Sequence, residues 1–208
     1  MFLPGRNRRL ALVFLLFWSF LVLYPRPAAL GESLYRLFVH PVQMEAVTPL
    51  IPGLPPGAEP AELERHILKA FPYHHDWQVY GYPWYFPTTA EAMEKGMGDC
   101  KTRFIVLASL FEALQVPYEL LISPTHIWIS YAGKEETTLE SMEAALFYRD
   151  GEETKFKLPR VDWLESAAIT WEAFWVYMPP QRKTALIAGL AFALLLFFQP
   201  TDTRRLQR

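Results

Sequence analysis

Cysteine is nearly absent from this chain, since Cys100 is the only one in 208 residues. No disulfide can therefore form within the chain, and any thiol chemistry must use this side chain. The chain also lacks a marked excess of positive or negative charge: it has 20 lysines and arginines and 22 aspartates and glutamates, a formal net charge of −2. Nucleic-acid binding depends on a basic surface, so we expect no nucleic-acid partner.

A convincing group of metal ligands is also missing. His74, His75 and Asp76 are adjacent, but neighbouring side chains of an extended chain point to opposite sides. No second group of ligands accompanies them elsewhere in the sequence. We therefore expect no metal ion and no cofactor.

Two apolar runs are present instead, one near each end, at residues 10–24 and 185–198. Each is short for a bilayer span, since 15 helical residues reach roughly 22 Å. Residues 26–29 read Arg-Pro-Ala-Ala and offer no small-x-small cleavage site, so we expect the first run to be an uncleaved signal-anchor. We expect the second run to span the membrane too. A secreted enzyme with a cleaved signal is the alternative.

Arginines lie between each apolar run and the nearer end of the chain, and they predict the orientation in the membrane. They favour a two-pass protein of the cell membrane, with both termini in the cytoplasm and the intervening domain outside it. These arginines are Arg6, Arg8, Arg9, Arg204, Arg205 and Arg208.

Composition divides the chain into six parts. Prolines and glycines crowd the stretch after the first apolar run, which predicts an extended linker. A tryptophan-rich stripe precedes the second run and indicates either ordinary core or an amphipathic helix in the lipid headgroup layer. The predicted parts are a signal-anchor (1–25), a Pro-rich linker (26–59), a folded domain (60–160), a juxtamembrane amphipathic helix (161–180), a membrane helix (181–200) and a basic tail (201–208).

The surroundings of Cys100 predict a nucleophile at the start of a helix. Gly96 and Gly98 break the preceding segment, and Asp99 can accept a backbone N–H as the N-cap. Apolar residues then recur at helical spacing, which predicts a helix over 100–114 with one buried face. The positive end of the helix dipole favours the thiolate.

His126 and Glu140 are the predicted partners of this thiol. Strand patterns precede and follow Gly133, which can take the positive φ of a three-residue hairpin loop. A hairpin centred there places His126 opposite Glu140, because cross-strand partners then have numbers that sum to 266. This register predicts that residues 135–139 form a strand and that the Glu140 carboxylate orients the imidazole.

Aromatic residues crowd residues 77–86 and have two interpretations. They pack in the core and its loops, or some of them line a substrate groove and help the Cys100 amide to bind an oxyanion. The residues that we expect to contact substrate are Trp84, Tyr85, Trp128 and Asp99.

These motifs resemble the transglutaminase-like core of the papain-like superfamily, over about residues 60–145. The likeness rests on Gly-Asp-Cys-Lys at 98–101, His-Ile-Trp at 126–128 and Leu-Glu-Ser at 139–141. Residues 85–93 resemble the lead-in of the bacterial transglutaminase-like cysteine peptidases. The resemblance implies an α+β fold in which the cysteine-bearing helix packs on an antiparallel sheet.

The resemblance also implies a triad of Cys100, His126 and Glu140 that attacks amide bonds of proteins or peptides through a thioester. Two positions depart from the family: Glu140 stands where Asp is usual, and Lys101 stands where the peptidase-like group commonly has an acidic residue. Hydrolysis is the default outcome, and transfer to an amine is the alternative. A non-catalytic, membrane-tethered binding or assembly module is the rival function. The sequence does not indicate an oligomeric state.

Overall fold

The computed structural model describes residues 6–150, 153–160 and 162–199. The chain folds into two compact units. The terminal unit joins Met1–Leu30 to Met178–Arg208, and the central unit comprises Gly31–Tyr177. The predicted basic tail at 201–208 lies outside the described residues.

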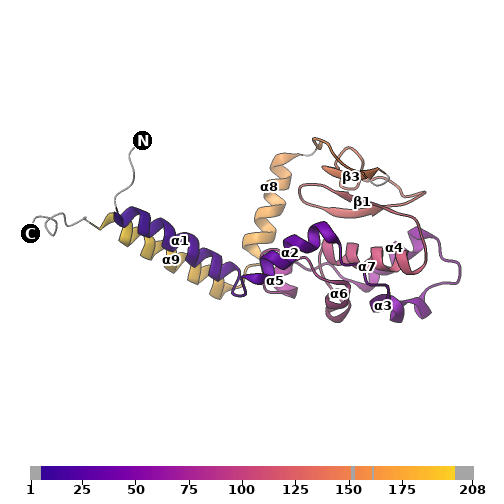
Figure 1. Ribbon diagram of the computed structural model, residues 1–208, viewed down its shortest axis with the longest axis horizontal. Helices are drawn as coiled ribbons and strands as arrows, with labels where there is room; N and C mark the ends of the chain where they lie inside the picture. Colours follow the sequence, from indigo (N-terminus) through magenta and orange to yellow (C-terminus); the bar gives the residue numbers. More distant parts are fainter. Residues whose placement is uncertain (1–5, 151–152, 161, 200–208) are drawn as a thin grey trace, which may run out of the picture. The chain divides into compact units, whose positions relative to one another are not determined.

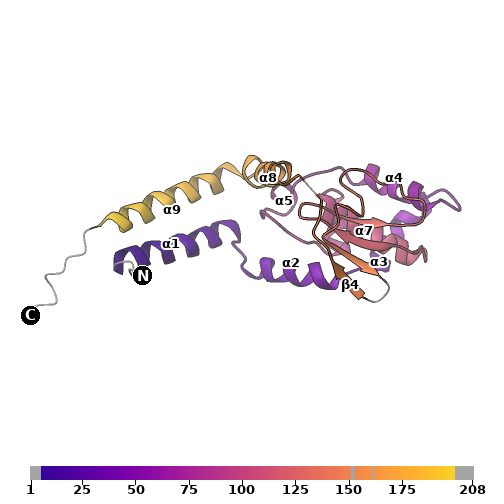
Figure 2. The ribbon, with the colours of Figure 1, turned by 90° about the horizontal axis from the view of Figure 1, so that it is seen from above.

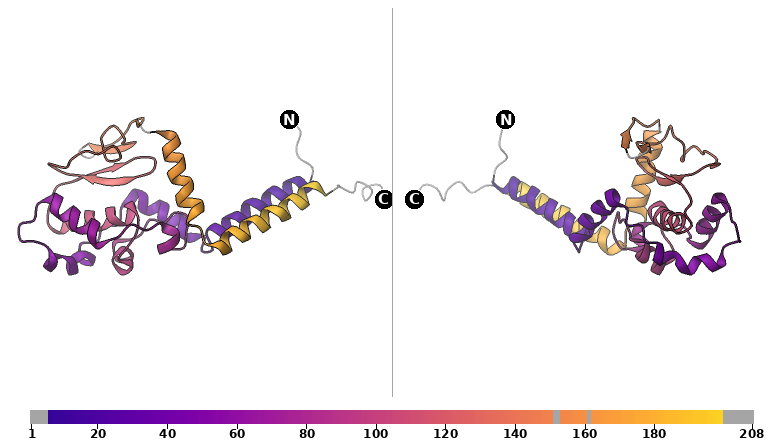
Figure 3. Two further views of the ribbon diagram at one scale, coloured as in Figure 1. Left: turned by 180° about the vertical axis from the view of Figure 1, so that it is seen from behind. Right: turned by 45° about the vertical axis from the view of Figure 1, so that its right-hand side comes forward.

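The terminal unit is a pair of antiparallel helices, α1 (Arg6–Leu23) and α9 (Pro180–Phe198), which lie side by side in Figures 1 and 3. Trp18 Nε1 donates to the Ala185 carbonyl at 2.8 Å. Gly189 faces the same indole, and a side chain there would overlap it. The glycine therefore allows the two helices to approach closely.

Composition supports one or two membrane-spanning helices in the described part of the chain. α9 is long and apolar enough by itself, whereas α1 meets the same criterion only together with α2 (Ala28–Val39). The predicted apolar helices at both ends are thus confirmed as helices. By length and composition they are candidate spans.

The predicted extended linker at 26–59 is wrong. This stretch forms α2, α3 (Met44–Val47) and a 3₁₀ helix, η1 (Thr48–Gly53). Its apolar side chains join the core, and Val47 is fully buried. The prolines are compatible with this structure because one lies in the first turn of η1 and the short 3₁₀ segment needs few backbone bonds.

The core of the central unit is built around one long apolar helix, α7 (Cys100–Ala113), against which α3, α4 (Pro60–Ala70), α6 (Thr89–Lys95) and the sheet pack. Every side chain of α7 from Phe104 to Phe111 is buried, so the expectation of a single buried face is wrong. α7 is enclosed by other helices and by the sheet, and for this reason it is apolar on all sides. The other helices are α5 (Asp76–Val79), α8 (Trp163–Trp171) and the π-helical η2 (Glu172–Val176).

Within the described residues, four short antiparallel strands form the second layer of the central unit, and Figure 2 shows this layer from above, with α7. Their spatial order is β2-β1-β3-β4, and β1 pairs with β2 so that Leu121 faces Trp128. The structure therefore has the predicted mixed α+β class, with Cys100 at a helix start. The strands are β1 (Glu119–Ile122), β2 (Ile127–Ser130), β3 (Phe147–Asp150) and β4 (Glu153–Phe156).

Of the hairpin predicted across Gly133, only the turn is present. Gly133 has a φ of 84°, and Lys134 N donates to the Tyr131 carbonyl at 3.1 Å. Residues 135–139 are not a strand, and β2 pairs with β1 instead. The reason lies in the side chains, because 135–138 are Glu-Glu-Thr-Thr, all exposed, and give a strand no apolar face to bury.

Replacement of Gly98 by alanine is expected to destabilise the central unit by about 2 kcal/mol. The new methyl would overlap Thr102 Oγ1 and lie 2.5 Å from Thr102 Cβ, and Thr102 is fully buried. Urea unfolding of the full chain in detergent measures the change. Gly31→Ala is the control, since nothing lies within 4 Å of that position. Equal unfolding midpoints for the two variants would contradict the close approach.

Candidate active site

Cys100 is the first residue of α7 and is half-buried. Gly96 ends α6 with a φ of 61°, in the left-handed conformation that glycine adopts without strain. Asp99 caps α7, and its side chain accepts the Lys101 N–H at 3.0 Å, so the predicted N-cap is confirmed. The thiol therefore lies at the positive end of a helix dipole.

His126 lies directly before β2 and is held by a tight turn. Its backbone N–H donates to Ser123 Oγ at 3.0 Å, and its carbonyl accepts the Ser123 N–H at 2.8 Å. The imidazole stacks on Trp128, with ring centroids 5.6 Å apart. Nε2 takes the Glu140 contact, and the Cys100 thiol lines the same cavity as the ring. Nδ1 is therefore the ring nitrogen that remains for the sulfur.

Glu140 reaches the histidine from a loop. Its Oε1 lies 2.8 Å from His126 Nε2, so the predicted histidine–carboxylate pair is confirmed. The route that the hairpin register predicted is wrong, because Glu140 is in no strand. Its loop is held locally by a hydrogen bond from Glu140 N to Thr137 Oγ1 at 3.1 Å.

These contacts move the pKa values of both partners. Burial lowers the pKa of His126, but its hydrogen bonds to Cys100 and Glu140 outweigh burial and raise it to about 9. Burial raises the pKa of Glu140, but hydrogen bonds from His126 and Lys134 outweigh it and lower the pKa to about 2. A protonated imidazole next to an ionised carboxylate is therefore the stable form at neutral pH.

Lys134 ties the Glu140 loop to α4. Its Nζ lies 2.9 Å from Glu140 Oε2 and 2.5 Å from Glu64 Oε1, and its side chain is 8% exposed. Glu64 also accepts a hydrogen bond from the Tyr131 hydroxyl at 2.5 Å. One Glu140 oxygen thus faces the imidazole and the other faces a buried ammonium. The sequence pattern indicated only a turn at this lysine and gave no sign of its role.

A second buried network lies beneath Cys100. Lys101 Nζ lies 2.9 Å from Asp76 Oδ2 and also contacts Asp99. Burial and then the nearby Asp99 raise the pKa of Asp76 to about 7, although Lys101 opposes the shift. Burial lowers the pKa of Lys101, but the carboxylates of Asp76 and Asp99 and the Cys100 thiol outweigh it and raise it well above its ordinary value. A permanent ammonium therefore lies close to the thiol.

A cavity of about 70 Å³ joins the three predicted catalytic residues, Cys100, His126 and Glu140. This volume holds about two water molecules or a single carbonyl group. The rest of its wall comes from α4, α7, β2 and Tyr73, and most of these side chains are apolar. A thiol, an imidazole and a carboxylate thus line one cavity, which is the arrangement that covalent acyl transfer requires.

The residues predicted to contact substrate separate in the structure. Trp128 lines the cavity, whereas Trp84, Tyr85 and Asp99 are not in its wall. Trp84 packs against the core. The Tyr85 hydroxyl donates to Glu91 at 2.8 Å, and Asp99 is occupied as the helix cap.

Tyr73 also lines the cavity, although its sequence context did not predict this. A parallel bridge between Tyr73 and Gly98 brings it beside Cys100, and the Arg103 guanidinium lies 5.3 Å from its ring centroid. The bridge joins residues 25 positions apart, and no local pattern signals such a contact. The sequence around Tyr73, which follows Pro72, contains no motif that indicates a functional site.

The chain matches no protein-family model, no curated protein and no solved structure. The chemistry of this site is therefore argued from its geometry.

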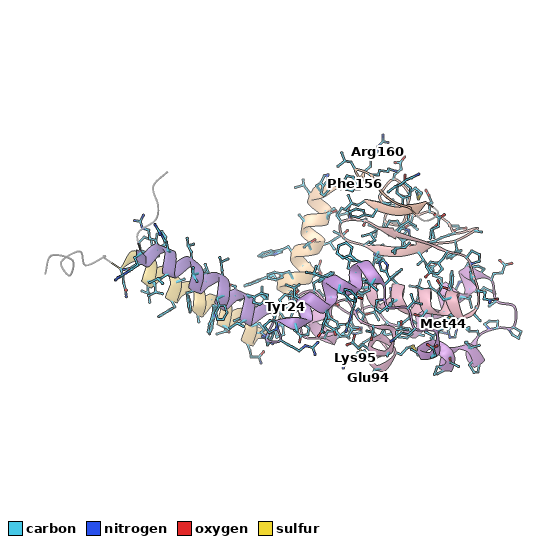
Figure 4. The ribbon with its side chains drawn as sticks, in the orientation of Figure 1. Tyr24, Met44, Glu94, Lys95, Phe156 and Arg160 are labelled. Carbon is cyan, nitrogen blue, oxygen red and sulfur yellow. The ribbon has the colours of Figure 1, made fainter. Side chains whose placement is uncertain are left out.

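Lys134→Met is expected to lower the free energy of unfolding by about 2 kcal/mol at pH 7, because Glu140 and Glu64 lose their shared cation. This loss of stability should shrink as the pH falls from 4.5 toward 2. The ionised Glu140 carboxylate, whose pKa is lowered to about 2, stabilises the fold fully above this pH range and no longer below it. Urea unfolding at several pH values measures it. Lys95→Met is the matched control, because Lys95 meets only an exposed Glu94 at 3.9 Å, at the surface in Figure 4. Equal losses in both variants would refute the role of Lys134.

Lys101→Met is expected to destabilise the protein by about 3–5 kcal/mol, because it leaves two buried carboxylates without a cation. The further change Asp76→Asn should restore part of this loss by removing one of the charges. A double-mutant cycle of unfolding free energies tests the coupling. Additive effects of the two changes would show that the network is not energetically linked.

Proposed function

We propose that this protein is a membrane-anchored, transglutaminase-like cysteine enzyme that acts on amide bonds of proteins or peptides. The observation that carries the proposal is the meeting of Cys100, His126 and Glu140 around one cavity, with the imidazole hydrogen-bonded to Glu140 and its pKa raised by Cys100 and Glu140. A buried structural cysteine has no need of such a pair. The motif resemblance supports the same assignment.

The chemistry begins from an ion pair in which His126 already carries the proton of the Cys100 thiol, and Glu140 orients the imidazolium. The thiolate then attacks the amide carbonyl carbon, and the oxyanion is stabilised by backbone amides at the start of α7. The C–N bond breaks as His126 returns its proton to the leaving amine, which leaves a thioester on Cys100. Water or a second amine attacks this thioester, transfers a proton to His126 and releases the thiol.

Hydrolysis is the favoured outcome because water is always present at a site open to solvent. Membrane attachment is proposed through α9 and α1, with both termini in the cytoplasm and the central unit outside it. Arg6, Arg8 and Arg9 in the first turn of α1 support this orientation. A lone cysteine suits that compartment, since a catalytic thiol finds no intramolecular disulfide partner.

Alkylation of Cys100 by iodoacetamide tests the activated thiol. Because the pKa of His126 is raised to about 9, the wild-type rate should change little between pH 6 and 8. In His126→Ala the rate should rise about tenfold per pH unit, as for an ordinary thiol, and at pH 6 it should be at least tenfold below wild type. Glu140→Gln should give an intermediate profile, and Cys100→Ala is the blank.

Slow alkylation with the same pH profile in wild type and His126→Ala would favour a non-catalytic binding module. A reactive thiol leads to a second measurement, the release of ammonia or amine from a panel of peptide amides. Addition of a primary amine then separates hydrolysis from transfer. Incorporation of the amine in place of hydrolysis would assign the chain to the transferases.

A further inference from the structure

α8 exposes an apolar surface, and none of its side chains is buried. Trp163 is 60% exposed, Leu164 84% and Trp171 59%. Isolated exposed apolar residues are ordinary, but three large ones on two helical turns form a patch that indicates a partner.

Most of the exposed large apolar residues share one side of α8, whereas Ile169, which is 41% exposed, lies on the other side. Trp163, Ala167 and Trp171 are four residues apart and therefore lie on one face, with Leu164 beside them. Glu165 and Glu172 lie on the opposite side. Residues 162–178 contain no lysine or arginine, so this surface cannot attract an acidic partner or an anionic lipid by charge.

We propose that this face of α8 lies in the lipid headgroup layer, with the bilayer as its partner. The chain itself supports this occupant. Residues 177–179 separate the end of η2 from Pro180, the first residue of the candidate span α9, and they reach at most about 14 Å. A segment that close to a membrane helix meets the interface, where tryptophan is the preferred apolar residue.

The same segment supports the wall of the catalytic cavity. The Phe174 carbonyl accepts the Trp77 indole N–H at 2.9 Å, and the Tyr177 ring stacks on His75 with centroids 3.9 Å apart. His75 packs edge-on against Tyr73 at 5.4 Å, and Tyr73 lines the cavity of Cys100. Aromatic contacts therefore lead directly from η2 to the reacting thiol.

This connection indicates the class of substrate, and the inference rests on the proposed function. The cavity wall is supported by a segment that lies in the headgroup layer. The cavity is therefore accessible to polypeptides that are themselves held at the bilayer surface. The substrate is therefore an amide in a membrane-anchored or membrane-bound polypeptide. Attachment to the same surface raises its effective concentration at the cavity.

Fluorescence quenching in nanodiscs tests the docking surface. The full chain is reconstituted in zwitterionic phosphatidylcholine with bromines at carbons 6 and 7 of one acyl chain. We expect strong quenching of tryptophan emission, and the quenched fraction should fall in Trp163→Phe/Trp171→Phe. Trp84→Phe, which removes a ring packed against the core, should instead raise that fraction slightly, because it removes emission that the bromolipid does not reach.

Two results would overturn the lipid assignment. Trp163 and Trp171 quenched by aqueous acrylamide but not by bromolipid would show a surface in water. Shielding from both quenchers would show that protein, such as a second copy, covers the face. Exchange of the neutral lipid for an anionic one should leave the quenching the same, because the face carries no basic residue.

A second experiment tests the link to the site. In nanodiscs, Tyr177→Ala removes the ring that stacks on His75 and should slow Cys100 alkylation at least threefold, whereas Tyr177→Phe should retain the wild-type rate. Equal rates in all three proteins would refute the link.

Hydrolysis of a lipid-attached peptide amide should exceed that of the free peptide at least tenfold, and equal rates would refute the substrate class. Failure of the proposed function is distinct, because Cys100 would then be unreactive in wild type whatever the quenching shows.

Discussion

The hydrogen bond of 2.8 Å between His126 Nε2 and Glu140 Oε1 is the contact on which the site depends. Neither residue lies in a regular element, so neither is positioned by a ladder of backbone bonds. His126 is held by the Ser123 turn, and Glu140 is held by Lys134, which is itself anchored on Glu64 of α4. Side-chain ion pairs therefore replace the strand pairing that would position these residues in a hairpin.

Charge is concentrated at the thiol although the whole chain is nearly neutral. The His126 imidazolium lies on one side of Cys100, and the buried Lys101 ammonium lies close to it as well. Both cations are matched by carboxylates, which keeps the networks stable inside the protein. Because α7 is enclosed by other elements along most of its length, the first turn that carries the thiol has little freedom to move.

Local signals predicted the parts of the site that are built from local contacts. Asp99 caps the helix of Cys100 as expected, and Gly133 makes the expected turn. The pair of His126 and Glu140 was also predicted, but through a hairpin that does not form. The error came from treating residues 135–139 as a strand, although the exposed polar side chains of 135–138 cannot contribute to a core.

The sequence alone determined the apolar helices at the two ends, the helix that begins at Cys100 and its cap, because each depends on neighbours within a few positions. Only the tertiary structure decided that residues 26–59 join the core, that Tyr73 lines the cavity and that Lys134 holds Glu140. These contacts join residues far apart in the chain. They form because burial of one charge or one apolar face requires a partner, and the fold rather than the local pattern determines which partner is within reach.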